Sequence, residues 1–355
     1  MHDIEELRKY EFLDSLEGIP ASKASNRLTL WHTARSIFPG FMICAVISLA
    51  AMFLSEHYNA PAMLLCLLLG MVFHFMSQED STKDGINFTA QTVLRFGVIL
   101  IGARIMLSDF TALGMPVIAL VLCSTVVVIL LGVLLSKALG LGKDQGLLIG
   151  GATAICGASA ALAISSVLPK SKDLEYNTLL AVIGVTLMGT IAMITYPVII
   201  GFLHFNDYQA GILIGGTIHD VSQVVGAGYS VSEQAGDTAI LVKLMRVFML
   251  VPLLIAFALF FNQEKNKPKG KRFKFPLFLL GFILLVTLNS FHLIPAHIMP
   301  IIKDTSKWML IMAITAVGMK TSLKALFSLG WRPIFLVCAE TVFIFSVYFG
   351  FLLMG

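Results

Sequence analysis

We single out seven of the ionisable side chains that lie inside long apolar stretches of this sequence, because each one needs a physical explanation there. They are Arg95, Arg104, His219, Asp220, Lys243, Arg246 and Glu340. Placing such a group in hydrocarbon costs about 2.5–3.5 kcal/mol on insertion scales. Lys243 and Arg246 are three residues apart, so they share one face of a helix. A paired basic face of this kind needs a carboxylate or a bound anion for neutrality.

The His219–Asp220 pair is a natural place for a proton to load, because histidine titrates near neutral pH. A histidine bonded to a carbonyl group is an equally good interpretation. Asp220 is also the obvious protein partner of Lys243 and Arg246, in which case the pairing would be purely structural. Gln223 lies three residues after Asp220 and shares its helix face.

Two further arginines, Arg95 and Arg104, are nine residues apart and lie on opposite faces of one helix, about 13.5 Å apart along its axis. They cannot serve one site directly. We expect Arg104 to extend toward lipid headgroups, and Arg95 either to do the same or to contact substrate. Without Arg104, three cations (Arg95, Lys243 and Arg246) face two carboxylates, Asp220 and Glu340. This balance favours an anion over a cation as cargo.

The composition shows where these residues lie. Hydrophobic residues make up 57% of the 355 residues and charged residues 13%, whereas soluble domains carry about 25% charged residues. The sequence therefore predicts an integral membrane protein and excludes a cytosolic enzyme, a nucleic-acid-binding module and a secreted disulfide scaffold. The five cysteines are scattered without a metal-ligand spacing, so we expect no metal and no cofactor.

Eleven apolar stretches are each near the length of about 20 residues that crosses a bilayer. We expect a single all-helical transmembrane domain over residues 36–355, preceded by an amphipathic cytosolic cap over residues 1–35. The stretches are Ser36–Ser55, Asn59–Met76, Gln91–Leu107, Leu113–Leu139, Gly146–Leu168, Leu174–Phe205, Gln209–Tyr229, Thr238–Phe261, Pro276–Phe291, Ile298–Met319 and Pro333–Met354.

The orientation follows from the Lys and Arg residues of the short loops, which favour a cytoplasmic N-terminus. If all eleven stretches cross the membrane, Lys170 and Lys172 lie on the side opposite to the cytoplasm. They move inside if the glycine-dense stretches Gly146–Leu168 and Gln209–Tyr229 are broken or re-entrant helices instead. The expected number of crossings is therefore nine to eleven.

Two internal similarities indicate inverted repeats. Gly102–Gly114 aligns without a gap with Gly318–Gly330, and GLLIGGATAI at Gly146–Ile155 resembles GILIGGTIHD at Gly211–Asp220. Chance similarity between apolar segments is the alternative. Inverted repeats with glycine-interrupted segments are typical of secondary transporters. In such proteins the N-termini of half-helices present N–H groups to an anion.

Four motifs in order resemble the YeiH-type bacterial inner-membrane family, also called a sulfate exporter family. They are GGATAICGASAA, GGTIHDVSQVVGAGY, LVKLMRV and GMKTSLKALFSLGWRP, within about Leu94–Phe335. The resemblance implies a polytopic transporter related in fold to sodium/proton antiporters and bile-acid symporters, exporting sulfate or another sulfur-containing anion. This chain departs from the family after the first motif, where its proline comes only at Pro169.

We interpret the chain as a secondary anion transporter of the bacterial inner membrane, with the anion between Gly150–Ala160 and Gly215–Gly226. His219 and Asp220 would couple transport to a proton or another ion. The expected substrate-binding residues are Lys243, Arg246, Cys156, Gly157, Ser159, Ser222, Gln223, Gly215, Gly216 and Arg95.

Two alternatives stay open on the sequence. One is a membrane-embedded hydrolase with Ser159 or Cys156 as nucleophile and His219–Asp220 as base; the other is an anion channel. The expected partners are the small anion and the bilayer but no nucleic acid, and a homodimer is one option for the assembly. The substrate, the direction of transport and the coupling ion cannot be read from the sequence.

Overall fold

The computed structural model describes residues 28–58, 60–169, 173–261, 277–295, 297–321 and 330–354. These ranges leave out residues 1–27 of the expected cap (residues 1–35), together with Lys170, Lys172 and residues 322–329 of the second repeat. Every regular element within the described residues is a helix. The prediction of an all-helical protein is therefore confirmed for this part of the chain.

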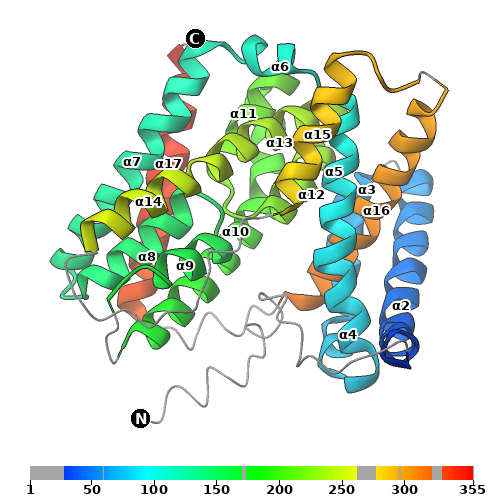
Figure 1. The fold of residues 1–355 in the computed structure, drawn as a ribbon, viewed down its shortest axis with the longest axis horizontal. Helices are drawn as coiled ribbons and strands as arrows, with labels where there is room; N and C mark the ends of the chain where they lie inside the picture. Colours follow the sequence, from blue (N-terminus) through cyan, green and yellow to red (C-terminus); the bar gives the residue numbers. More distant parts are fainter. Residues whose placement is uncertain are drawn as a thin grey trace.

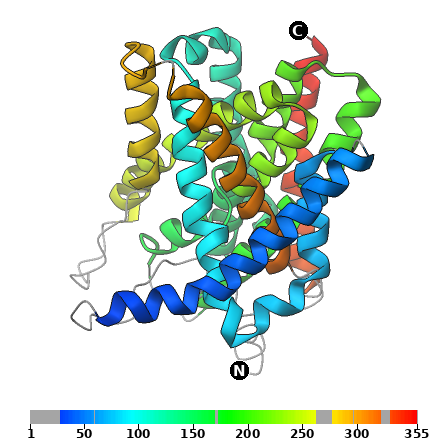
Figure 2. The ribbon, with the colours of Figure 1, turned by 90° about the vertical axis from the view of Figure 1, so that its right-hand side faces the viewer.

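The helices form two bundles that lie side by side (Figure 1). The flanking bundle combines N-terminal helices with two later ones. Its members are α2 (Leu28–Tyr58), α3 (Ala62–Val72), η1 (His74–Gln78), α4 (Asp80–Phe88), η2 (Thr89–Val93), α5 (Leu94–Ile101), η3 (Gly102–Arg104), α15 (Leu277–Ser290) and α16 (Met299–Lys320). Figure 2 shows α2 crossing the outer face of this bundle over α16.

The core bundle is built from the middle of the chain and its last helix. Its members are α7 (Gly114–Ala138), α8 (Lys143–Ala154), α9 (Ala158–Ser165), α10 (Leu174–Leu203), α11 (Asp207–Thr217), α12 (Val221–Val231), α13 (Glu233–Phe248), α14 (Leu250–Phe261) and α17 (Trp331–Met354). The short α6 (Leu107–Ala112) leads into this bundle from η3, and α12 packs against α3 and α16 of the flanking bundle.

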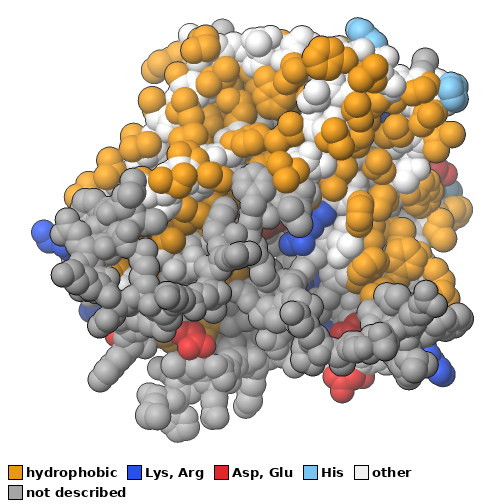
Figure 3. Space-filling model, in the orientation of Figure 1, with side chains coloured by type: hydrophobic (Ala, Val, Ile, Leu, Met, Phe, Trp, Pro, Cys, Tyr) orange, Lys and Arg blue, Asp and Glu red, His pale blue; other side chains and the backbone are white. Residues whose placement is uncertain are grey.

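Six helical segments of the described chain are long and apolar enough to span a membrane: Arg35–Tyr58, Asp80–Arg104, Gly114–Ala138, Leu174–Leu203, Glu233–Phe257 and Trp331–Met354. Hydrophobic side chains cover most of the upper part of the face in Figure 3. On α7 the large apolar residues Met115, Leu130 and Leu134 are exposed, as expected of a helix that faces lipid. The eleven passages and the inverted repeats stay predictions.

Small residues bring the helices of the flanking bundle into backbone contact. Gly70 of α3 faces the carbonyl oxygen of Thr315 and the Cα of Gly318, both on α16, and a methyl group on Gly70 would collide with that oxygen. Association of apolar helices depends on such close approach, because lipid tails remove the hydrophobic drive that operates in water.

We therefore expect Gly70→Ala to lower the melting temperature of the purified protein in detergent. The matched control is Gly350→Ala on α17, where a methyl group meets no other atom within 4 Å. That variant should melt at the wild-type temperature or slightly above, because alanine favours the helix by about 1 kcal/mol over glycine. Equal melting temperatures for Gly70→Ala and wild type would contradict the close-packing argument.

Candidate functional site

The first glycine-rich segment forms a hairpin of two short helices, α8 and α9, which we name hairpin 1 (residues 143–165). Gly132 of α7 lies against Gly146 and Gly150, so α7 and α8 pack closely. Gly151 of α8 lies against the side chain of Ile164 of α9, so the chain folds back after the turn. At 12 residues, α8 is about 18 Å long and cannot cross a hydrocarbon core of about 30 Å.

The second glycine-rich segment, hairpin 2 (residues 207–231), has the same construction. Gly211 and Gly215 of α11 lie against Thr238 and Ala239 of α13, so these helices run in parallel. Gly228, near the end of α12, lies against Gly236 near the start of α13, so α12 runs antiparallel to both. Hairpin 2 therefore returns to the side from which it started. The 30-residue α10 joins the two hairpins, which consequently enter from opposite sides.

The tips of the two hairpins meet at Lys243. Its ammonium group donates hydrogen bonds to the carbonyl oxygens of Ile155 (2.7 Å) in hairpin 1 and Ile218 (2.8 Å) in hairpin 2. The side chain is fully buried. One lysine thus bridges the two turns, and Gly157 packs against the backbone of His219 in the same place.

Arg246, one turn further along α13, makes the same kind of bridge. Its Nε donates to the carbonyl of Ala154 (2.8 Å), its Nη2 to that of Thr153 (2.6 Å) and its Nη1 to that of Gly216 (2.7 Å). This guanidinium is also fully buried. Tyr348 of α17 packs directly on Gly216, which leaves no room for a side chain at this end of α11.

Both cations therefore bind the C-terminal carbonyl groups of α8 and α11. The last carbonyls of a helix have no partner within the helix and carry about half a negative charge in total. Cations from α13 satisfy them in the buried interior of the core bundle. Within the described residues no ion pair joins Asp220 to Lys243 or Arg246. The expected pairing with Asp220 is replaced by pairing with the two helix ends.

Asp220 instead caps the N-terminus of α12. Its Oδ1 accepts hydrogen bonds from the backbone N–H (2.8 Å) and the hydroxyl (2.6 Å) of Ser222. The side-chain amide of Gln223 donates to the carbonyl of Thr186 (2.9 Å) and to the hydroxyl of Thr190 (3.1 Å) on α10. Asp220 and Gln223 thus fix the start of α12, and both are committed to protein contacts here.

The N-terminus of α9 differs, because no side chain caps it. Gly157 precedes this helix with a φ of 61°, a conformation that favours glycine. Within the described residues the backbone N–H groups of Ala158 and Ser159 have no acceptor. Ser159 is exposed although its neighbours are buried. This helix end therefore carries two N–H groups without acceptors, one on the buried Ala158 and one on the exposed Ser159.

The charges at the two tips do not cancel. The two helix C-termini and two helix N-termini offset each other at about half a charge each. Lys243 and Arg246 add two positive charges, and Asp220 removes one. Before Lys320 of α16 is counted, the two hairpin tips and α13 therefore retain about one net positive charge, next to the uncapped end of α9.

The contacts of His219 bear on the hydrolase alternative. Its Nε2 lies 3.0 Å from the hydroxyl of Thr341 on α17, and its Nδ1 has no partner in the described part of the chain. The hydroxyl of Ser159 donates to the carbonyl (3.0 Å) and the Sγ (2.9 Å) of Cys156. No hydrogen bond among the described residues links either nucleophile to the histidine.

Lys320 faces the same tips from the flanking bundle. It is the last residue of α16 and lies close enough to Asp220 for their charges to interact. The sequence analysis did not single out Lys320, although the gapless alignment of Gly102–Gly114 with Gly318–Gly330 pairs it with Arg104. Arg95 is exposed on α5, which packs on α15 and α16. The structure does not bring Arg95 to the hairpin tips.

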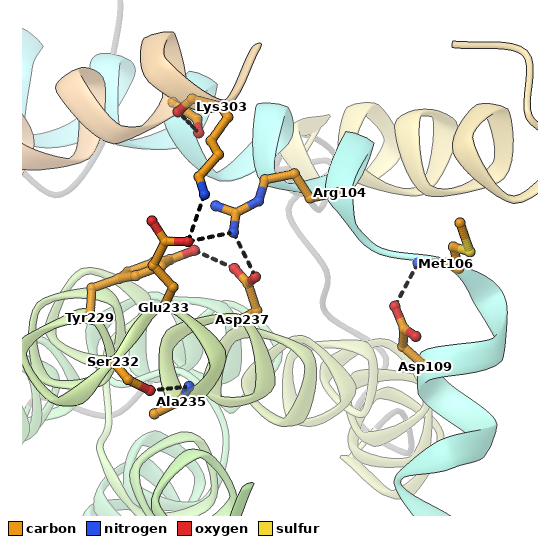
Figure 4. Close-up of polar contacts among 10 residues, drawn as sticks. Arg104, Met106, Asp109, Tyr229, Ser232, Glu233, Ala235, Asp237 and Lys303 are labelled. Carbon is orange, nitrogen blue, oxygen red and sulfur yellow. Dashed lines mark hydrogen bonds and ion pairs between the residues drawn. The ribbon is translucent and has the colours of Figure 1, made fainter. Parts of the chain in front are cut away.

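A cluster of charges joins the two bundles near the start of α13 (Figure 4). Arg104 of η3 lies 3.0 Å from Asp237 and 3.6 Å from Glu233, and Lys303 of α16 lies 2.8 Å from Glu233. The hydroxyl of Tyr229 donates to the second carboxylate oxygen of Asp237 (2.6 Å). Arg104, expected to extend toward lipid, therefore forms an ion pair with the core bundle.

Comparison with known proteins gives the family. The profile of the family described as conserved hypothetical protein 698 matches residues 39–337. The chain is 48% identical over 316 residues to a UPF0324 membrane protein of Chlorobaculum tepidum, covering 88% of each chain. It is 47% identical over 311 residues to the UPF0324 membrane protein TauZ of Paracoccus denitrificans, covering 86% of this chain and 92% of that one.

The chain belongs to the UPF0324 family of membrane proteins. This confirms the resemblance to the YeiH-type family that the motifs indicated. It also confirms that the chain is a membrane protein. The role of each predicted site residue of this UPF0324 protein stays a prediction.

The contacts of Arg246 generate one prediction. Arg246→Ala should lower the melting temperature in detergent by several degrees, because each hydrogen bond from a charged group contributes about 1.5–3 kcal/mol. Arg246→Lys should recover part of the loss, since an ammonium group cannot reach all three carbonyls in the same plane. The control is Lys307→Ala on α16, an exposed cation. A wild-type melting temperature for Arg246→Ala would show that the tips hold without it.

The charge cluster between the two bundles generates a second prediction. Arg104→Gln and Asp237→Asn should each lower the melting temperature, and the double variant should lose less than the two single losses together. Groups in direct contact typically show coupling energies of about 0.5–3 kcal/mol. The control cycle pairs Arg104→Gln with Asp304→Asn, an exposed residue of α16, and should be additive. Additivity in the first cycle would mean that the two side chains act independently.

Proposed function

We propose that this UPF0324 protein is a secondary transporter of a small anion. The observation that carries the proposal is the meeting of two hairpin tips with a net positive charge and one uncapped helix N-terminus. Hairpins that enter from opposite sides bring backbone ends together at the middle of a membrane domain, the position at which secondary transporters bind their cargo.

In this proposal the anion accepts hydrogen bonds from the backbone N–H groups of Ala158 and Ser159 and from the Ser159 hydroxyl. Helix N-termini are suited to this role, because their N–H groups and dipole both attract negative charge. Lys243 and Arg246 do not contact the anion in this proposal. They hold the hairpin tips together and supply positive charge near the site. Lys320 approaches from the flanking bundle, so the anion would lie where the two bundles face each other.

Alternating access would then require the bundles to move against each other. The contacts between them are suited to this, because they run through α12 and the cluster of Arg104, Lys303, Glu233 and Asp237. Ion pairs at a partly exposed position are weak enough to break and re-form. With the N-terminus in the cytoplasm of the bacterial cell, this cluster would close the outer side of the inner membrane.

The cargo we propose is sulfate or a related sulfur oxyanion, moved outward. The net positive tip and the hydroxyl and N–H donors support a small oxyanion as a class. Sulfate and the outward direction are supported only by the resemblance to the family named for sulfate export. Hydrolase and channel activity have no contact among the described residues that favours them.

Binding to purified protein tests the proposal. Sulfate, sulfite, thiosulfate, taurine and small carboxylates are each titrated at two pH values by isothermal calorimetry. At least one should bind the wild type, and Ser159→Ala should bind it about tenfold more weakly, because a hydrogen bond to a charged group contributes about 1.5–3 kcal/mol.

The matched control is Ser166→Ala, just after α9. Ser166 is also exposed, and its hydroxyl also bonds the carbonyl three residues before it. This variant should keep the wild-type affinity. Binding that is equal in Ser159→Ala, or absent for every anion, would remove the α9 N-terminus as the site.

A further inference from the structure

Glu340 is an acidic residue that the proposed transport mechanism does not yet use. It lies in the membrane-spanning helix α17 and is fully buried. Neither carboxyl oxygen has a hydrogen-bond partner, and no cation pairs with it, within the described residues. A buried carboxyl group with no partner is rare in proteins and calls for a reason.

A slot between α7 and α8 holds this carboxyl group. Its Oε1 occupies the space that a Cβ atom on Gly132 would fill, and the carbonyl of Gly146 borders the same space. The hydroxyl of Thr153 on α8 is also buried without a partner and lies close enough to interact with Glu340. The slot thus exists only because residue 132 is a glycine, and it contains hydrogen-bond acceptors.

The surroundings decide the protonation state. An ionised carboxylate without a cation or donor in an apolar interior is strongly disfavoured, so such a group takes up a proton instead. A neutral Glu340 can donate its O–H to the Thr153 hydroxyl, which resolves two unpartnered groups at once. These surroundings therefore favour the neutral acid over the carboxylate in the slot.

Glu340 is also connected to the proposed anion site. The carbonyl of Thr153 accepts the 2.6 Å hydrogen bond of Arg246, and the next residue on α17, Thr341, holds His219 of hairpin 2 at 3.0 Å. One turn of α17 thus contacts both tips. Through Thr153, a change of charge at Glu340 would reach Arg246, one of the two cations at the tips.

Helix α17 itself also carries Arg332, Cys338 and Tyr348, and the helices packed on it carry further titratable and charged groups. Those nearest the tips are Arg246, Lys243, His219, Asp220, Cys156 and Tyr348. On the four helices that pack on α17, the remaining ones are Cys123 and Lys137 of α7, Lys143 and Asp144 of α8, Glu175, Tyr176 and Tyr196 of α10, and Asp207 and Tyr208 of α11. Most of these lie toward helix ends. Glu340 and Asp220 are therefore the two acids of the core bundle next to the tips, and Asp220 is committed to capping α12.

We propose that Glu340 is a proton-binding site linked to the anion site, so that the protein carries a proton together with its anion. This rests on the proposed function. A negative charge at the tips disfavours a second one at Glu340, so the bound anion strengthens proton binding. By reciprocity the proton strengthens anion binding by the same factor.

The first experiment reads the proton directly and needs no substrate. Infrared spectra of the purified protein should show the C=O stretch of a protonated carboxyl group, shifted in D₂O. The band should vanish in Glu340→Gln, which keeps the shape and neutrality of the side chain. It should persist in Glu56→Gln, an exposed glutamate of α2. Identical bands in wild type and Glu340→Gln would mean that Glu340 is ionised, and this would overturn the proposal.

The second experiment reads the linkage, with sulfate as the probe anion. Lowering the pH should tighten sulfate binding to the wild type, by about tenfold per pH unit at most for one proton. Glu340→Gln should bind sulfate with one affinity at every pH, near that of the wild type at low pH. A pH dependence that survives unchanged in Glu340→Gln would overturn the linkage.

Proteoliposomes that enclose a pH-sensitive dye then separate the two proposals. Wild-type protein should acidify the interior when sulfate enters down its gradient, whereas Glu340→Gln should move labelled sulfate without the pH change. A wild-type protein that moves sulfate with no proton overturns the coupling alone. One that binds and moves no anion overturns the proposed function and the linkage, while the infrared band still decides the proton site.

Discussion

The structure depends on one set of hydrogen bonds. Two cationic side chains of α13 donate them to the unpaired carbonyl groups at the C-termini of α8 and α11. A membrane interior offers no water to the carbonyl groups that a helix leaves unpaired, so each must find a donor within the protein. Lys243 and Arg246 supply these donors to α8 and α11 together. The same contacts join the two hairpin tips and concentrate positive charge there, so folding and the proposed attraction of an anion have one physical cause.

The sequence predicted the environment of the site better than its bonds. Composition alone predicted a helical membrane protein, and the cost of burying charge singled out Lys243 and Arg246. The partners of these cations are backbone carbonyls, which no residue type encodes, and so Asp220 was the expected partner. Its capping role did have a signal, because an acid followed three residues later by Gln223 is the spacing of a capping box.

Long-range ion pairs explain the rest of the difference between sequence and structure. Arg104 and Asp237 are 133 residues apart, and only the docking of the two bundles brings them together. From its position near a helix end, Arg104 was therefore expected to reach headgroups. Arg95, nine residues earlier, faces outward because a helix turns through two and a half turns over that distance. Periodicity gave the separation of the two arginines but could not say which face met the core bundle.

The two hairpins share one construction, and the difference between their turns bears on how many anions the site takes. Asp220 precedes α12 and neutralises its N-terminus, whereas Gly157 precedes α9 and has no side chain to do so. Had an acid occupied both turns, the tips would carry no excess charge and would not attract an anion. With glycine at both, they would carry about two positive charges and two open helix ends. The observed arrangement leaves one open helix end and, before Lys320 is counted, about one positive charge, and the proposed site would then suit a single anion.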